Sequence, residues 1–481
     1  MDHPIKNIRY HKWTKEGVKK LYQSFRHILN IEEPQLYFPI MSLFFYIHNT
    51  KFSHKIIDFQ RNQYIQEIVE YKQLKDYNSN ISVEAKVFNR LQENKKISLF
   101  GKVIPLLDPI HYLLNNYNNS NHRNPLLPSN YSFNTFTKIN DMNNMAYIDV
   151  FFSYLVSRIV ESDKNPSFPL YYGSMNCVGE YSHDITEDID ELKYHGGFQK
   201  MVDLVEIDEY VNGDSDSCSD SCSDSSSNSS SSSLPDNDYV ARFKKFPIIY
   251  LFIESLEGTL EDIIKNDLSL NLLKSCLFQI SFALIYLQKH FHFTHNDLHI
   301  NNVMFSSTNK PYLYYKYNNH YYKVPTYGKM FKIIDFGRSI FTYGMKTYMN
   351  DVFSKYGEAE GQYTHPPQVN FLKTNYDDMV YPSYHFDLCR LAITMIDEIR
   401  YNHDDDLEDE DDYQDFLDFL KYLVTDKNGV RLDKEKDNFD LYVKISRNAC
   451  NCLPRDVICE SFFKEYRIKK KQFPKSTYYT V

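Results

Sequence analysis

Residues 293–305 read FTHNDLHINNVMF, and this stretch decides what the rest of the chain is expected to build. It contains Asp297 and, five residues later, Asn302, and the downstream sequence IIDFG places Asp335 at the end of an apolar run. Phosphoryl transfer needs a carboxylate that orients the acceptor hydroxyl, and oxygen ligands that hold magnesium against the phosphates. Asp297 suits the first task, and Asn302 and Asp335 suit the second. Residues 293–302 are therefore a candidate catalytic loop.

An ordinary polar turn between a helix and a strand would use the same residue types. Two motifs in this order, HxDLxxxN and then DFG, favour the catalytic interpretation, because either motif alone is much weaker than the pair.

Composition bounds the class of protein. The 481 residues can form two or three domains, or one two-part enzyme with insertions. A formal net charge of −10 argues against nucleic acid as the main partner, because binding to phosphate backbones needs a basic surface. The chain opens without a basic-then-apolar leader, and its apolar run at 38–47 is too short to cross a bilayer. We therefore expect an intracellular protein with no membrane partner, and the sequence leaves its oligomeric state open.

The N-terminal residues 1–78 are predicted to form a mainly helical extension. Apolar residues recur there at helical spacing, as at Val18, Leu21 and Phe25. No residue of this segment is assigned to chemistry.

A lysine and an acid upstream of the catalytic loop are candidates for binding the nucleotide. Lys102 lies inside an apolar strand at 97–107, where it is either a solvent-facing residue or a cation that meets phosphate. Lys138 is the rival candidate. Residues 146–159 place apolar side chains on one face and predict an amphipathic helix. Asp149 of that helix is the available carboxylate partner for Lys102, and a solvated or near-cap acid is the alternative.

The run at 246–253 is almost continuously apolar, which is typical of a strand buried on both faces. The backbone from Glu254 to Leu256 follows it and is a candidate for pairing with an adenine edge, and Glu257 for contact with a ribose hydroxyl; a plain connector would look similar. A long apolar helix is predicted at 268–290, just before the catalytic loop. Asp387 opens another apolar helix, and its carboxylate is expected to bond backbone donors of the catalytic loop.

Residues 213–238 are almost entirely Ser, Asp and Cys. Such a composition cannot bury apolar surface, so a disordered surface insertion is predicted.

These motifs resemble those of the protein-kinase superfamily. Their sequences are similar to those of the divergent protein-kinase-like proteins of giant nucleocytoplasmic DNA viruses. The matching segments are 168–174, 295–302, 332–339 and 357–363. The resemblance implies an α+β, two-lobed protein-kinase-like fold. Its small, mostly β N-lobe with one long helix would span 79–253, and its larger helical C-lobe 254–481, after the extension 1–78.

The resemblance also implies the chemistry. ATP and Mg²⁺ would be the cofactors, with Asp297, His299 and Asn302 as catalytic residues and Asn302 and Asp335 as metal ligands. Lys102, Asp149, Glu254, Leu256 and Glu257 would line the nucleotide site. The implied partner is a protein that receives phosphate on serine or threonine, in the cytoplasm of an infected host cell or in the virion.

The chain departs from the family pattern at four places, one of which is that no clear Ala-Pro-Glu closes the activation segment. It has no GxGxxG, since Gly17 and Gly101 are the only glycines before Gly173. Asn296 stands where many kinases carry an arginine that binds an activation-loop phosphate, so activity is predicted not to need that phosphorylation. His299 replaces a lysine and is expected to contact the transferring phosphate.

Two other interpretations remain open. The first is a small-molecule phosphotransferase of the choline or aminoglycoside kinase type, because the HNDLHxxN pattern also suits that class. The second is a non-catalytic pseudokinase scaffold, which the missing glycine loop favours.

Overall fold

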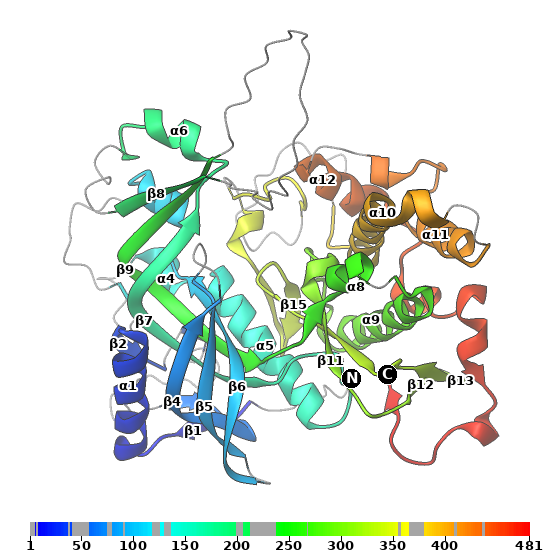
Figure 1. Ribbon diagram of the computed structural model, residues 1–481, viewed down its shortest axis with the longest axis horizontal. Coiled ribbons are helices and arrows are strands. Elements are labelled where there is room, and N and C mark those ends of the chain that lie inside the picture. The colour runs from blue at the N-terminus through cyan, green and yellow to red at the C-terminus, as the bar shows by residue number, and fades with distance from the viewer. Residues whose placement is uncertain are drawn as a thin grey trace, which may run out of the picture.

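The chain forms a mixed α+β structure in which antiparallel sheets and helices share one core (Figure 1). This computed structural model describes residues 5, 8–36, 39–40, 57–74, 79–89, 92–117, 126–128, 136–198, 205–211, 237–266, 268–354, 357–364, 380–407, 411–434 and 438–481.

A seven-stranded antiparallel sheet dominates the N-terminal half of the described chain (Figure 1). Its strands lie in the order β2, β7, β9, β6, β5, β4, and β8 pairs with β9 beside this path. They are β2 (Glu32–Gln35), β4 (Gln63–Gln73), β5 (Ile81–Asn89), β6 (Gln92–Pro105), β7 (Tyr171–Asp184), β8 (Val205–Val211) and β9 (Asn237–Glu254). The apolar run 246–253 lies buried in β9 at the centre of the sheet, so the predicted strand is confirmed.

The described part of the N-terminal segment, residues 8–36 and 57–74 above all, is not mainly helical, and the prediction is wrong there. Helix α1 (Lys15–Leu29) does form, but β2 and β4 are strands of the large sheet. Strand β4 pairs with β5, so the expected boundary at residue 78 separates two hydrogen-bonded strands. Buried Ile65 and Ile68 are three residues apart in β4, and register shifts between Ile65 and Glu67 and between Ile68 and Glu70 allow both to face the core.

The C-terminal half of the described chain is richer in helices. They are α8 (Leu260–Asn266), α9 (Leu270–Phe291), α10 (Phe386–Leu407), α11 (Asp411–Leu423), α12 (Asn438–Asn448) and α13 (Pro454–Val457). Three small sheets accompany them: β10 (Gly258–Thr259) with β11 (Val303–Ser307) and β14 (Lys329–Ile333); β12 (Tyr312–Tyr317) with β13 (His320–Pro325), β17 (Arg467–Ile468) and β18 (Tyr479–Thr480); and β15 (Ile340–Tyr343) with β16 (Lys346–Met349).

Short elements complete the described chain. They are β1 (Tyr10–Lys12), β3 (Ile57–Phe59), α3 (Pro109–Leu113), α4 (Thr137–Asn140), α6 (Ile189–Tyr194), and the 3-10 turns η4 (Ile300–Asn302), η5 (Asp351–Phe353), η7 (Leu432–Lys434), η8 (Ser461–Tyr466) and η9 (Lys470–Gln472).

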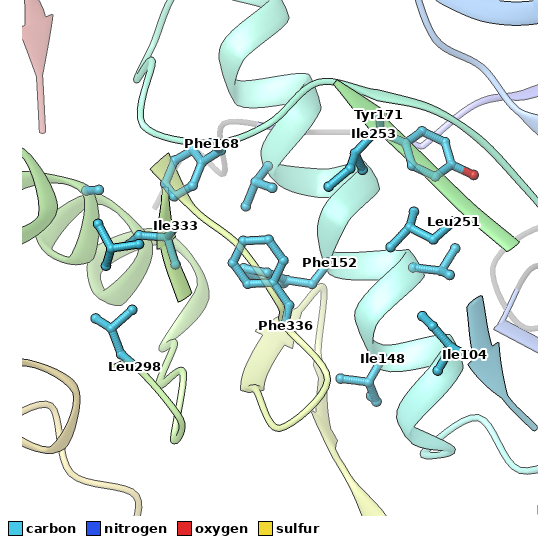
Figure 2. Close-up of a cluster of buried hydrophobic side chains, with 14 of the residues drawn as sticks. Ile104, Ile148, Phe152, Phe168, Tyr171, Leu251, Ile253, Leu298, Ile333 and Phe336 are labelled. Atoms are coloured by element: carbon cyan, nitrogen blue, oxygen red, sulfur yellow. The ribbon is translucent and has the colours of Figure 1, made fainter. Parts of the chain in front are cut away.

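Helix α5 (Met145–Glu161) lies between the large sheet and the helical half (Figure 1). Its first turn is capped by Asn144, whose side chain accepts a hydrogen bond from the backbone of Ala146. The helix is apolar on almost every face because protein surrounds it. Figure 2 shows its buried residues between sheet residues and residues around the catalytic loop; the labelled members are Ile104, Ile148, Phe152, Phe168, Tyr171, Leu251, Ile253, Leu298, Ile333 and Phe336.

Helix α9 is long and apolar enough to cross a membrane by length and composition alone, and it is the one such helix among the described residues. Most of its apolar window, 83%, is buried inside the protein, as in a core helix. The predicted helix at 268–290 is thereby confirmed.

The Ser/Asp-rich segment predicted to be disordered falls mainly on residues 212–236, which lie outside the described residues. Its predicted end is too late, because Asn237 and Asp238 belong to β9. Strands β8 and β9 pair from Val211 and Asn237 onward, so the segment connects two neighbouring antiparallel strands.

Candidate active site

The candidate catalytic loop, residues 293–302, connects α9 to β11. Helix α9 ends at Phe291 and is capped by His292, whose φ of 48° is left-handed; the chain then pairs with β15 through Thr294 and Ile340. The loop closes with the 3-10 turn η4, which ends at Asn302. Its start and end are therefore both fixed by regular elements.

Asp387 anchors this loop from the first turn of α10. Its two carboxylate oxygens accept hydrogen bonds from the backbone amides of His295 and Asn296, at 2.9 and 3.0 Å. The side chain is fully buried, and burial raises the pKa of Asp387 against the opposing effect of His295 and these two donors. The predicted contact between Asp387 and the loop is confirmed.

The side chain of Asn302 holds the loop from within. Its Nδ2 donates to the backbone oxygen of Asp297 at 2.9 Å and lies 3.0 Å from Nε2 of His299. The amide nitrogen is thus directed into the protein, and the amide oxygen remains as the donor atom available to a cation. Burial lowers the pKa of His299, with a smaller opposing effect from Asp297, so the imidazole is neutral at neutral pH.

Strand pairing brings Asp335 next to this loop. Val303 of β11 pairs with Ile333 of β14, and the amide of Ile334 donates to the backbone oxygen of Asn302 at 3.1 Å. Nε2 of His295 lies 2.9 Å from the backbone oxygen of Ile334. Asp335 itself has a φ of 62°, a left-handed conformation that non-glycine residues adopt at an energetic cost.

Lys102, Asp149 and Asp335 form one charged cluster, which we call the Lys102 cluster. The ammonium Nζ lies 2.7 Å from Oδ2 of Asp149 and 2.8 Å from Oδ1 of Asp335. The other oxygen of Asp149 accepts the backbone amide of Phe336 at 3.0 Å. The expected pairing of Lys102 with Asp149 is therefore present, and one lysine links the large sheet, α5 and the segment after β14.

The charges in this cluster reinforce one another. Burial acts to lower the pKa of Lys102, but the two carboxylates outweigh it and raise that pKa. Burial acts to raise the pKa of Asp335, but Lys102 holds it at about 2. Burial raises the pKa of Asp149 in spite of Lys102. Lys102 is therefore a cation at neutral pH, and Asp335 is an anion.

Aromatic rings pack next to the Lys102 cluster. The ring centroid of Phe336, which follows Asp335, lies 5.1 Å from that of Phe152 in α5. The ring of Phe293 stacks on Phe152 with a centroid distance of 4.6 Å. A side chain at Gly337 would place its Cβ 3.2 Å from Met145, so only a small residue fits easily there. The residue types of the DFG motif thus match their packing.

No family model and no curated protein matches this chain.

The rival lysine lies elsewhere. Nζ of Lys138 is 2.7 Å from Oδ2 of Asp351, and this pair lines a polar cavity of about 610 Å³ together with Asp108 and His183. Lys138 takes no part in the Lys102 cluster.

The residues expected to meet adenine and ribose are engaged within the protein. The carboxylate of Glu254 pairs with buried Lys332 at 2.5 Å and accepts the amide of Leu170 at 2.9 Å. The carboxylate of Glu257 accepts the amide and hydroxyl of Ser307 at 2.7 and 2.6 Å, which lowers its pKa. A ribose hydroxyl would have to compete with Ser307 for Glu257. Leu256 is partly exposed on the connector between these two acids.

Asn302 and Asp335 are the residues that could hold a magnesium ion. Mg²⁺ prefers oxygen ligands, and the pair brings an amide group and an ionised carboxylate on neighbouring backbone segments. The side chain of Asp335 is 42% exposed, and its Oδ1 lies 2.8 Å from Nζ of Lys102.

Three contacts of the site were not predicted from the sequence. The hydroxyl of Tyr442 donates to Oδ1 of Asp297 at 2.6 Å, and the hydroxyl of Tyr363 donates to Oδ1 of Asn296 at 2.7 Å. Lys332 is the third, as the buried partner of Glu254. Tyr442 lies 145 positions from Asp297, so no local spacing could indicate that contact. For Lys332, a charged residue in an apolar strand next to DFG was the available signal.

Proposed function

We propose that this chain transfers the γ-phosphoryl group of ATP to serine or threonine hydroxyls of a protein substrate. The observation that carries the proposal is the Lys102 cluster. A cation and two acids from three distant parts of the chain meet beside Asn302, whose side chain bonds the backbone of Asp297. Three acids, a cation and an amide in this arrangement suit a phosphate and its metal.

The proposal includes a two-lobed, protein-kinase-like arrangement. The seven-stranded sheet with α5 would be the small lobe, and the helices around α9 and α10 the large one. The nucleotide would then lie between Lys102 and the catalytic loop. Because β4 belongs to the large sheet, the proposed N-lobe would begin before residue 79, the start predicted from the sequence.

Each residue has a distinct task in the proposed reaction. Bound MgATP supplies the phosphoryl group, with the metal neutralising phosphate charge. Lys102 offers a fixed positive charge to phosphate oxygens, and Asn302 and Asp335 would hold the metal. Asp297 accepts a hydrogen bond from the acceptor hydroxyl and then its proton, which orients the oxygen for attack. His299 is neutral; its Nδ1 accepts the amide of Asn301 and its Nε2 faces the side chain of Asn302, so the ring lies within the loop beside the proposed metal ligand.

A protein acceptor is favoured by the segment that follows Asp335. Its described part bonds to the catalytic loop through Tyr363 and Asn296, and Asn296 also donates to the backbone oxygen of Arg338 at 2.9 Å. These contacts are made by neutral groups. An arginine at position 296, as in many kinases, would instead need a phosphate on this segment as its partner. They support activity without phosphorylation of this segment.

Transfer of radiolabel from ATP to casein and myelin basic protein, with Mg²⁺ present, tests the proposal. We expect the Asp297→Asn protein to be slower by roughly 10²–10⁴-fold, because removal of a positioned proton acceptor costs about that much. Both proteins should show the same melting midpoint. Equal incorporation by the two proteins would contradict phosphotransfer at this site and favour the scaffold.

A further inference from the structure

The carboxylate of Asp297 has one side-chain donor among the residues that the structure describes, and that donor comes from a distant helix. Tyr442 lies in α12, and its hydroxyl donates to Oδ1 at 2.6 Å. Burial raises the pKa of Tyr442, and the nearby charge of Asp297 raises it further, so the phenol keeps its proton. The contact is therefore a hydrogen bond from a neutral donor to the candidate proton acceptor.

Helix α10 holds Tyr442 in this place. The ring of Tyr442 lies 5.8 Å from the ring of Phe386, and the guanidinium of Arg390 lies 5.0 Å above it. Asp387, between these two residues, bonds the backbone of the catalytic loop. One helix thus fixes both the loop that carries Asp297 and the tyrosine that contacts its side chain.

Helix α12 is itself tied to the segment beyond Asp335. The hydroxyl of Ser446 donates to the backbone oxygen of Gln362 at 3.1 Å, and Arg447 donates to the backbone oxygen of Gly361 at 2.8 Å. Tyr363, which follows Gln362, donates a hydrogen bond to the side chain of Asn296. The position of the Tyr442 hydroxyl is therefore determined from two sides.

The neighbours of Asp297 within the loop do not replace this contact. Asn302 bonds the backbone oxygen of Asp297 and leaves the carboxylate alone, and His299 faces Asn302. A carboxylate on a short side chain can rotate unless a donor fixes it, and a proton acceptor acts only from the right orientation.

We propose that Tyr442 is the positioning residue for Asp297: its hydroxyl fixes Oδ1 and so directs Oδ2 toward the acceptor hydroxyl. This inference rests on the proposed phosphotransfer function. It adds a residue from outside the catalytic loop to the reacting geometry.

Two other roles for Tyr442 give different results. The tyrosine hydroxyl can occupy the place of the acceptor, in which case its removal speeds transfer to other proteins. It can also be the acceptor itself: its oxygen would then bond to the γ-phosphorus as the bond to ADP breaks, and its proton would pass to Asp297. The experiment separates these roles from positioning.

The experiment compares full-length wild type with Tyr442→Phe and Tyr384→Phe, using MgATP with casein and myelin basic protein. Tyr384 is the matched control, because it is also partly buried and its hydroxyl lies 3.1 Å from Nδ1 of His292, away from Asp297. Tyr442→Phe should lower kcat by roughly 10- to 100-fold, as expected for loss of a hydrogen bond to a charged group, with KM for ATP unchanged. Tyr384→Phe should have the wild-type kcat.

The kcat and KM split distinguishes positioning from a structural role, since loosening of the fold would also weaken ATP binding. An unchanged kcat in Tyr442→Phe would overturn the inference. So would a faster rate, or phosphate found on Tyr442 of wild type by mass spectrometry and absent from Asp297→Asn. If wild type itself transfers no more phosphate than Asp297→Asn, the proposed function fails and this inference fails with it, whereas the other outcomes leave the function intact.

Discussion

The catalytic loop and the Lys102 cluster are assembled in opposite ways. In the loop, Asp297 and Asn302 are five residues apart. Backbone amides of His295 and Asn296 donate to Asp387, and the side-chain amide of Asn302 donates to the backbone oxygen of Asp297. In the cluster, Lys102 and Asp149 are 47 positions apart, and Asp149 bonds an amide 187 positions further on. The loop therefore depends on hydrogen bonds from neutral amides, and the cluster on charges brought together by the whole fold.

This difference has an energetic consequence. Removal of one charge from a buried pair leaves its partner uncompensated, at a cost of about 3–5 kcal/mol. Removal of one neutral hydrogen bond costs about 1–3 kcal/mol when the remaining group is buried. We therefore expect the cluster to be more sensitive to substitution than the loop.

The largest effect is expected for Lys102→Met. It leaves Asp149, whose side chain is 2% exposed, and Asp335 without their cation, and it removes the proposed phosphate contact. Phosphotransfer should fall by at least about 100-fold, because a preorganised charge at the phosphate is lost. The stabilisation of the protein by MgATP in a thermal melt should disappear as well.

Lys138→Met is the control for this change. Its pair with Asp351 is partly exposed on both sides, so the free energy of unfolding should change by at most about 1 kcal/mol. MgATP should stabilise this variant as it does wild type. If MgATP stabilised Lys102→Met equally well, Lys102 would not be a nucleotide ligand.

An intermediate effect is expected for Asp387→Ala in the anchor of the loop. The substitution leaves the buried amides of His295 and Asn296 without an acceptor, which should lower the free energy of unfolding by about 2–3 kcal/mol. Urea unfolding measures this loss. The rate should fall by about tenfold, because the loop that carries Asp297 would no longer be fixed.

Asp262→Ala is its matched control. Asp262 also accepts a backbone amide and a hydroxyl, both from Thr259, but on the exposed surface near the start of α8. Its loss should cost about 1 kcal/mol, as for other residues at helix N-termini, and leave the rate unchanged. Equal losses of stability in the two variants would show that burial of the loop anchor does not matter.

The same contrast explains what could be predicted from the sequence. The loop motif, the helix that carries Asp149 and the bond from Asp387 all follow from local spacing or from the cost of burying an unpaired acid. The pairing of Lys102 with Asp149 follows from no local spacing. It was predicted because a lysine that binds phosphate from a strand needs a carboxylate to hold it. The structure brings these two together, and Lys138 is excluded from the cluster.

The errors have physical causes of the same kind. Helical spacing at Val18, Leu21 and Phe25 does mark α1, but the prediction extended it over β2 and β4, which are strands of the main sheet. Tyr442 reaches the loop because α12 packs on α10, and Tyr363 reaches it because the segment 357–364 packs on the same helix. A chain with 41 tyrosines gives no way to choose these two in advance.

The smallest effect is expected for Tyr363→Phe, and it tests whether the neutral contact at Asn296 is needed. The change leaves Oδ1 of Asn296 buried without its donor, so the free energy of unfolding should fall by about 1–2 kcal/mol. Tyr154→Phe is the control, because it loses a comparable hydrogen bond, 2.9 Å to the backbone oxygen of Gln60, far from the loop. Both variants should lose similar stability in urea, but only Tyr363→Phe should lower the rate, and by less than about tenfold. A rate equal to that of Tyr154→Phe would mean that the hydrogen bond from Tyr363 to Asn296 does not control the geometry of the loop.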